Sequence, residues 1–118
     1  MLCNDFIDRV KSKNSTFEKS SSVDGDLPDF YQRFNPKNVY FEFDDMDIHL
    51  LSIEEIKSIT KEYYAIDCDF VFALSNSDPI FSKDKKIYTC AHGSKHPKVE
   101  LVADSFEDYM KMIIESEE

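Results

Sequence analysis

The spacing of apolar side chains predicts an amphipathic helix at the start of the chain. Over residues 2–11, Leu2, Phe6 and Val10 recur every four positions, which places them on one helical face. A polar, Ser-rich stretch over residues 12–26 follows, and its composition predicts a flexible loop.

A second, short helix is expected over residues 27–35. Pro28 suits the first turn of a helix, where its missing N–H is not needed, and Asp29 favours the positive end of the helix dipole. Pro36 is expected to end the helix, because proline restricts the residue before it.

Alternating apolar positions predict a β-hairpin built from residues 39–43 and 46–50, with Asp44-Asp45 at its turn. A two-residue hairpin turn prefers glycine, which this turn lacks. A longer loop is therefore the alternative.

Further strands are expected in the second half of the chain. Residues 70–74 are apolar on both faces, which predicts a central strand covered on both sides. A turn at Asp78-Pro79 is expected next. Three more strands are then predicted, over residues 80–81, 87–91 and 99–103.

Two helices are predicted from their N-terminal caps. Ser52 and Glu55 have the spacing of a capping box, and Asp104 is followed by Glu107 at the same spacing. The C-terminal helix has an apolar stripe at positions i, i+3, i+4 and i+7: Phe106, Tyr109, Met110 and Ile113.

The order of these elements predicts one α+β domain over residues 1–118, with its core over 27–115. We expect a mainly antiparallel or mixed sheet of about five or six strands, with the helices packed on it.

The net charge of the chain limits the classes of partner that it is expected to bind. There are 14 basic and 24 acidic side chains, so the formal net charge is −10. A negative field repels phosphate backbones, which excludes nucleic-acid binding as the main activity and also disfavours anionic membrane surfaces. It speeds encounter with a basic protein. The alternative is an acidic surface that only keeps the protein soluble.

Cysteine usage and hydropathy predict a soluble, cytoplasmic protein. The cysteines Cys3, Cys68 and Cys90 are odd in number and none forms a CxxC pair, which favours free thiols in a reducing compartment. The N-terminus lacks the apolar run of a signal peptide, and no stretch approaches the roughly 20 apolar residues of a membrane span.

Cys90, His92 and His96 are the candidate metal ligands or catalytic residues. Cys90 and His92 share one side of a predicted strand, and zinc accepts both side-chain types. A structural site needs a fourth ligand, which His49, Cys68 or a carboxylate would have to supply. A Cys–His nucleophile would need a lowered thiol pKa. The alternative, which we favour, is a buried cysteine beside two loop histidines, with no catalysis and no cofactor.

Acidic residues gather in two places, and they are the candidate partner-binding residues. One group precedes the second helix and the other surrounds the predicted hairpin turn: Asp24, Asp26 and Asp29, then Glu42, Asp44, Asp45 and Asp47. The residue order of a calcium loop is absent from both groups. They predict either a solvated acidic surface or a patch that docks onto a basic partner.

Several segments resemble, in order, those of the SUKH superfamily of Smi/Knr-type bacterial immunity proteins. They are LPDFYQRFN, LLSIEEI, FVFALSNSDPIF, IYTCAHG and LVADSFEDYMKMI, and together they span about residues 27–113. The chain departs from the family at residues 35–38, where members often have glycine, and in its Ser-rich loop.

The resemblance implies an α+β fold without catalysis. It also implies a cytoplasmic immunity protein that binds a cognate toxin domain, often a nuclease with a basic substrate cleft. A regulatory scaffold of the same fold, with no toxin partner, is the other alternative that the resemblance leaves open.

Overall fold

An α+β fold forms over the residues that the computed structural model describes, namely 2–20, 27–63, 66–91 and 98–116. Six strands form an antiparallel sheet in sequence order: β3 (Val39–Phe43), β4 (Met46–Leu50), β5 (Phe70–Ser75), β6 (Asp78–Lys83), β7 (Lys86–Thr89) and β8 (Glu100–Ala103). A smaller sheet pairs β1 (Thr16–Lys19) with β2 (Phe34–Lys37). The helices within these residues are α1 (Leu2–Val10), α2 (Asp29–Arg33), α3 (Ile53–Glu62) and α4 (Phe106–Glu115). The predicted fold class is confirmed.

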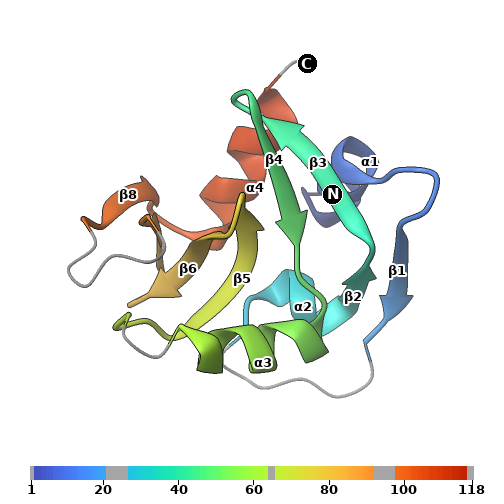
Figure 1. The fold of residues 1–118 in the computed structure, drawn as a ribbon. Coiled ribbons are helices and arrows are strands. Elements are labelled where there is room, and N and C mark those ends of the chain that lie inside the picture. The colour runs from blue at the N-terminus through green and yellow to red at the C-terminus, as the bar shows by residue number, and fades with distance from the viewer. Residues whose placement is uncertain (1, 21–26, 64–65, 92–97, 117–118) are drawn as a thin grey trace.

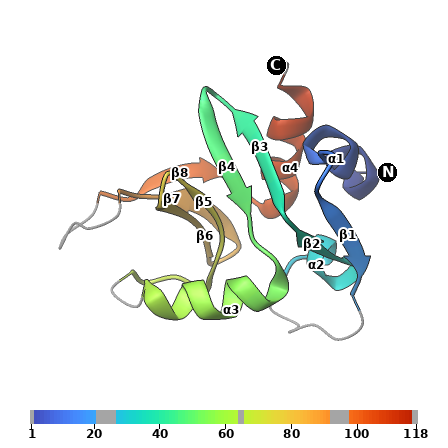
Figure 2. The ribbon, with the colours of Figure 1, turned by 45° about the vertical axis from the view of Figure 1, so that its right-hand side comes forward.

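The helices lie on different parts of the large sheet. Figures 1 and 2 show α1 and α4 side by side against the sheet, while α3 crosses the end of the sheet that lies opposite the β3–β4 turn. Phe6 and Val10 of α1 are almost completely buried. The N-terminal helix is therefore part of the core.

An aromatic cluster centred on Phe106 of α4 joins three elements. The ring of Phe106 lies 5.0 Å from that of Phe72 on β5, 6.2 Å from Phe30 and 5.9 Å from Tyr31 on α2. Phe72 meets Phe106 edge-on, which is a favoured geometry for aromatic pairs. Burial of these rings holds α2 and α4 against the sheet.

Asn35 connects β2 to the start of α3. Its Oδ1 accepts a hydrogen bond of 2.8 Å from the Ile53 N–H, and its Nδ2 donates to Glu54 Oε1 at 3.1 Å. The Ile53 N–H is one of the first N–H groups of α3 and has no acceptor within the helix. The predicted capping box is confirmed, because Ser52 Oγ accepts from the Glu55 N–H and Glu55 Oε1 accepts from the Ser52 N–H.

Three two-residue turns set the hairpins of the large sheet. Their six residues all have positive φ and none is glycine: Asp44, Asp45, Asn76, Ser77, Asp84 and Lys85. Asn and Asp tolerate the left-handed region better than other non-glycine residues, which explains the absence of glycine at four of these positions. The β3–β4 turn therefore contains only Asp44 and Asp45, as the sequence predicts. The alternative of a longer loop is ruled out.

The turn predicted at Asp78-Pro79 is wrong, because both residues belong to β6. The turn lies two residues earlier in the chain, at Asn76-Ser77. Ser75 and Asp78 close the hairpin, so the next pair, Leu74 with Pro79, is a non-hydrogen-bonded pair. Proline fits there because β5 needs no N–H from it.

The N-terminal half differs from its prediction in two respects. The stretch expected as a loop over 12–26 contains β1, whose Phe17 lies opposite Pro36 of β2. The second helix ends at Arg33, with Pro28 as its N-cap residue rather than in its first turn. A strand of a two-stranded sheet has one free edge, which accommodates the missing N–H of Pro36.

The cap of α4 is also one residue later than predicted. Ser105, not Asp104, is the N-cap residue, and its Oγ accepts a 3.0 Å hydrogen bond from the Asp108 N–H. Ser and Asp are nearly equivalent at this position, so sequence alone does not separate them.

Phe106→Ala is expected to lower the free energy of unfolding by about 3 kcal/mol, because it removes the ring at the centre of the aromatic cluster. Urea denaturation measures the loss. Met112→Ala, at an exposed position of the same helix, is the control and should change stability by less than about 0.5 kcal/mol. Equal losses for the two variants would contradict the central role of Phe106.

Asn35→Ala is expected to cost about 2 kcal/mol of stability, since the buried Ile53 N–H then has no acceptor. Glu54→Ala removes only the more exposed partner of Asn35 and should cost less than about 1 kcal/mol. The same denaturation measurement compares them. If Glu54→Ala costs as much as Asn35→Ala, the stabilisation does not come from the Ile53 N–H.

Candidate functional site

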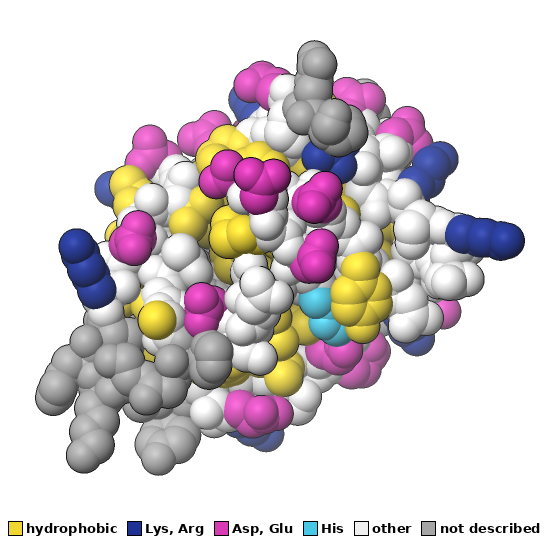
Figure 3. Space-filling view, turned by 45° about the horizontal axis from the view of Figure 1, so that its top comes forward, with side chains coloured by type: hydrophobic (Ala, Val, Ile, Leu, Met, Phe, Trp, Pro, Cys, Tyr) yellow, Lys and Arg dark blue, Asp and Glu magenta, His cyan; other side chains and the backbone are white. Residues whose placement is uncertain are grey.

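The turn between β3 and β4 carries a concentration of negative charge. Asp44 and Asp45 form the turn itself, and Asp47 of β4 lies opposite Glu42 of β3 in the antiparallel ladder. All four side chains are exposed. We call Glu42, Asp44, Asp45 and Asp47 the acidic hairpin. Figure 3 looks onto this end of the molecule and shows carboxylates gathered around exposed hydrophobic side chains.

Where the structure describes them, the two predicted groups of acidic residues lie at different ends of the fold. The structure brings Asp44, Asp45 and Asp47 together. Asp29 begins α2, which lies at the opposite end of β3 from the turn (Figure 1), and it lines a different groove that also contains Cys3. Asp24 and Asp26 lie outside the described residues.

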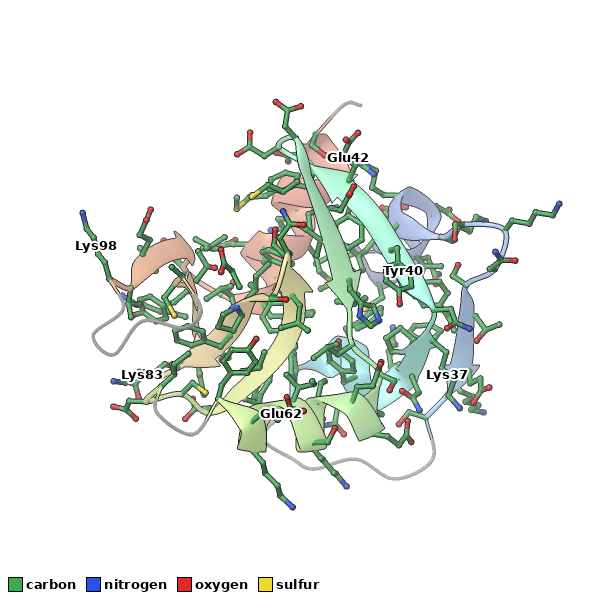
Figure 4. All side chains as sticks on the ribbon, in the orientation of Figure 1. Lys37, Tyr40, Glu42, Glu62, Lys83 and Lys98 are labelled. Carbon is green, nitrogen blue, oxygen red and sulfur yellow. The ribbon has the colours of Figure 1, made fainter. Side chains whose placement is uncertain are left out.

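Arg9 of α1 forms a hydrogen bond with the backbone of the acidic hairpin at Glu42. Its Nη2 donates hydrogen bonds of 3.2 Å to the Glu42 carbonyl oxygen and 3.0 Å to Ser116 Oγ. The guanidinium therefore ties β3 to the C-terminal end of α4. In Figure 4, Glu42 lies near the turn, whereas Lys37, Lys83 and Lys98 point outward at the margins of the fold.

An exposed aromatic pair adjoins the acidic hairpin. Tyr40 and His49 face each other across the β3–β4 ladder and stack with ring centroids 4.2 Å apart and planes 13° from parallel. His49 Nε2 also lies 3.8 Å from Glu55 Oε1 of α3, which is beyond hydrogen-bond distance. Tyr40 remains 60% exposed, so much of its ring is accessible to solvent.

A cleft opens beside the acidic hairpin, between β4, β8 and α4. Its volume is about 240 Å³. Apolar side chains make up much of its wall: Phe43, Met46, Ile48, Ile80, Val102 and Tyr109. The rest of the lining consists of Ala91 and of side chains with polar or titratable groups: Ser75, Asp78, Thr89, Cys90 and Glu100. We call this space the hairpin cleft.

The strand register explains how these distant residues meet. Ile48 pairs with Ser75 and Ser75 with Asp78, while Thr89 pairs with Glu100. Directly paired residues share one face of a sheet, so the cleft follows a row across the strands. Asp78 and Glu100 were not predicted from the sequence as site residues. Alternating polarity within one strand does not show that residues of two different strands lie on the same face of the sheet.

Cys90 lines the hairpin cleft, and its pKa is shifted in the direction that favours the neutral thiol over the reactive thiolate. It is almost fully buried, and its burial, followed by the negative charge of Asp78, raises its pKa. His92 and His96 lie outside the described residues. Among the residues that the structure describes, no group of three His, Cys, Asp or Glu side chains is placed to hold a metal ion.

Cys68 lies in a similar electrostatic setting. Burial raises the pKa of its thiol to about 11, with smaller contributions from Asp69, Asp67 and Cys90. A raised pKa keeps the thiolate fraction small at neutral pH, and the thiolate is the reactive form.

One structural finding bears on membranes. No helix within the described parts of the chain combines the length and apolarity required to cross a bilayer.

The two thiols should react slowly with iodoacetamide in the folded protein. Between pH 7.5 and 9.5 the Cys68 rate is expected to rise about tenfold per pH unit without a plateau, because its pKa is raised to about 11. The Cys90 rate should still be rising at a pH where the rate of the unfolded chain has levelled off, because its pKa is raised as well. Peptide mapping by mass spectrometry measures each rate. The chain in denaturant is the control, in which the rates should level off near the ordinary pKa of about 8.5. A plateau for Cys90 below pH 8 in the folded protein would restore it as a candidate nucleophile.

Comparison of the chain with known proteins found no relative. No protein-family model matches it, and neither a curated protein nor a solved structure does. The resemblance to the SUKH superfamily therefore rests on the residues quoted above, and the function has to be inferred from the surface.

Proposed function

We propose that this protein binds a basic protein toxin through the acidic hairpin and thereby neutralises it, as an immunity protein does. The observation that carries the proposal is the gathering of Glu42, Asp44, Asp45 and Asp47 at one end of the sheet, in a chain of net charge −10. Such a surface attracts a basic partner and speeds its association.

The form of the hairpin supports binding. Its two-residue turn and the Arg9 hydrogen bonds fix it before any partner arrives, so association loses little conformational entropy. The exposed side chains of Tyr40 and Met46 add apolar area beside the carboxylates. Protein interfaces commonly combine aromatic or Met contacts with charged surroundings.

The resemblance to the SUKH superfamily supports a toxin as the partner and the cytoplasm as the place of binding. A nuclease toxin carries a basic cleft for its nucleic-acid substrate. An acidic hairpin could cover or imitate that substrate without any chemical step. This mode of inhibition needs neither a catalytic residue nor a cofactor, and it is stoichiometric.

The proposal predicts that a neighbouring gene encodes a toxin domain, and the test uses such a domain once it is found. Co-expression of the two chains should protect the host, and the purified chains should form a complex whose association rate falls as salt is added. Replacing Asp44, Asp45 and Asp47 by Asn is expected to slow association about tenfold at low salt, as measured by stopped-flow fluorescence.

The matched control replaces Glu18, Glu62 and Glu107 by Gln. It removes the same number of charges at exposed positions on other elements. Association should slow much less than in the hairpin variant. Equal slowing would show that overall charge, rather than the acidic hairpin, guides the partner. A host that is not protected would contradict the immunity function itself.

A further inference from the structure

The hairpin cleft has the composition of a receptor for one amphipathic cation. We propose that it receives an arginine side chain of the basic partner, an inference that rests on the proposed binding function. The partner would then be recognised by a fixed pocket as well as by the general charge of the acidic hairpin.

The size of the cleft favours a single side chain. Its volume of about 240 Å³ is below the roughly 300–1,000 Å³ of pockets that hold small-molecule ligands. A cofactor or a nucleotide is therefore a poor match, while one long side chain entering from a partner's surface fits the space.

The walls of the cleft suit the stem of arginine. Met46 and Val102 provide apolar contact along its length, and Phe43 adds a half-buried aromatic ring, whereas Tyr109 is almost completely buried. Arginine buries its methylene stem along apolar surface while its guanidinium remains with polar groups. The guanidinium also stacks on aromatic rings more readily than the ammonium of lysine does.

The charges of the cleft suit the guanidinium. Asp78 and Glu100 contribute carboxylates from β6 and β8. Asp44 and Asp45 follow in the turn between Phe43 and Met46, which both line the cleft, whereas Glu42 and Asp47 lie on the other face of the hairpin. The negative charge of Asp78 reaches into the cleft, where it is the second cause, after burial, of the raised pKa of Cys90. A carboxylate partly shielded from water attracts a cation more strongly than a fully exposed one.

An anionic ligand fits the cleft poorly. Its described lining contains no lysine or arginine, and the carboxylates of Asp78 and Glu100 would repel a phosphate group. Charge complementarity therefore favours a cationic protein side chain over a nucleotide or a lipid headgroup.

The test uses a small probe in place of the partner. The ¹⁵N-labelled protein is titrated with Nα-acetyl-arginine methylamide, and its amide resonances are followed by NMR. Saturable shifts are expected at Ser75, Ile80 and Thr89. The neutral isostere Nα-acetyl-citrulline methylamide should bind at least about tenfold more weakly, because its head group has no charge.

Two variants with matched controls locate the probe. Val102→Phe fills the cleft and should abolish saturable binding, whereas Leu101→Phe, at the exposed neighbouring position, should leave it unchanged. Glu100→Gln is expected to weaken binding about threefold to fivefold, and Glu62→Gln on α3 should have no effect. Glu100 is exposed, so its variant tests the proposal even if Val102→Phe disturbs folding.

Three results would contradict the proposal that the hairpin cleft binds arginine: shifts spread over the whole acidic surface, equal binding of the citrulline probe, or unchanged binding by the Glu100→Gln variant. None of these measurements needs the toxin domain. A cleft that binds arginine in a protein that fails to bind the toxin would refute the proposed function alone. A toxin complex formed equally well by the wild type and by a folded Val102→Phe variant would refute the pocket alone.

Discussion

The register of the six-stranded sheet is the constraint on which the core and the candidate site both depend. Side chains alternate between the two faces of a strand, so a slip of one residue would exchange every inward and outward position. Two-residue turns at 44–45, 76–77 and 84–85 oppose such a slip in the three hairpins β3–β4, β5–β6 and β6–β7. The β5–β6 pairing also contains a register shift between Val71 and Ala73. With this register, Phe41 and Ile48 face the core while Glu42 and Asp47 face solvent.

The same register creates a local conflict at the acidic hairpin. Glu42 and Asp47 are like charges directly opposite each other, and two further carboxylates follow in the turn. Such pairs destabilise a sheet. The fold tolerates them because Arg9 anchors the Glu42 backbone and because Phe41 and Ile48 bury the other face of the same strands. A cation bound there would relieve the repulsion and thereby stabilise this end of the molecule.

Local signals in the sequence were sufficient for several elements. The Ser52–Glu55 capping box and the hairpin over 39–50 depend on residues a few positions apart, and both were predicted. The pairing of Phe17 with Pro36 was not, because two short polar strands far apart in the chain carry no signal that they belong together. Asp78-Pro79 was misplaced because the turn signal of Asn76-Ser77 immediately precedes it, and a proline in a strand is unusual.

The candidate site was predicted only in part, because some of its residues are close together in the sequence and others meet only in the folded sheet. Asp44, Asp45 and Asp47 lie within one hairpin, so their proximity follows from the chain itself. The hairpin cleft instead requires β4 to β8 in their final order, which places Glu100 on the same face as Asp78 although 22 residues separate them.

The distribution of charge also bears on the simplest alternative, an acidic surface that serves solubility alone. Solubility requires only that charges be spread and mixed over the surface. Here four carboxylates occur within the six residues 42–47, beside the exposed Met46 and Tyr40. Exposed apolar groups work against solubility, and adjacent like charges work against stability. A surface that combines both features has a physical reason when it binds a partner, because the partner covers the apolar groups and neutralises the charges.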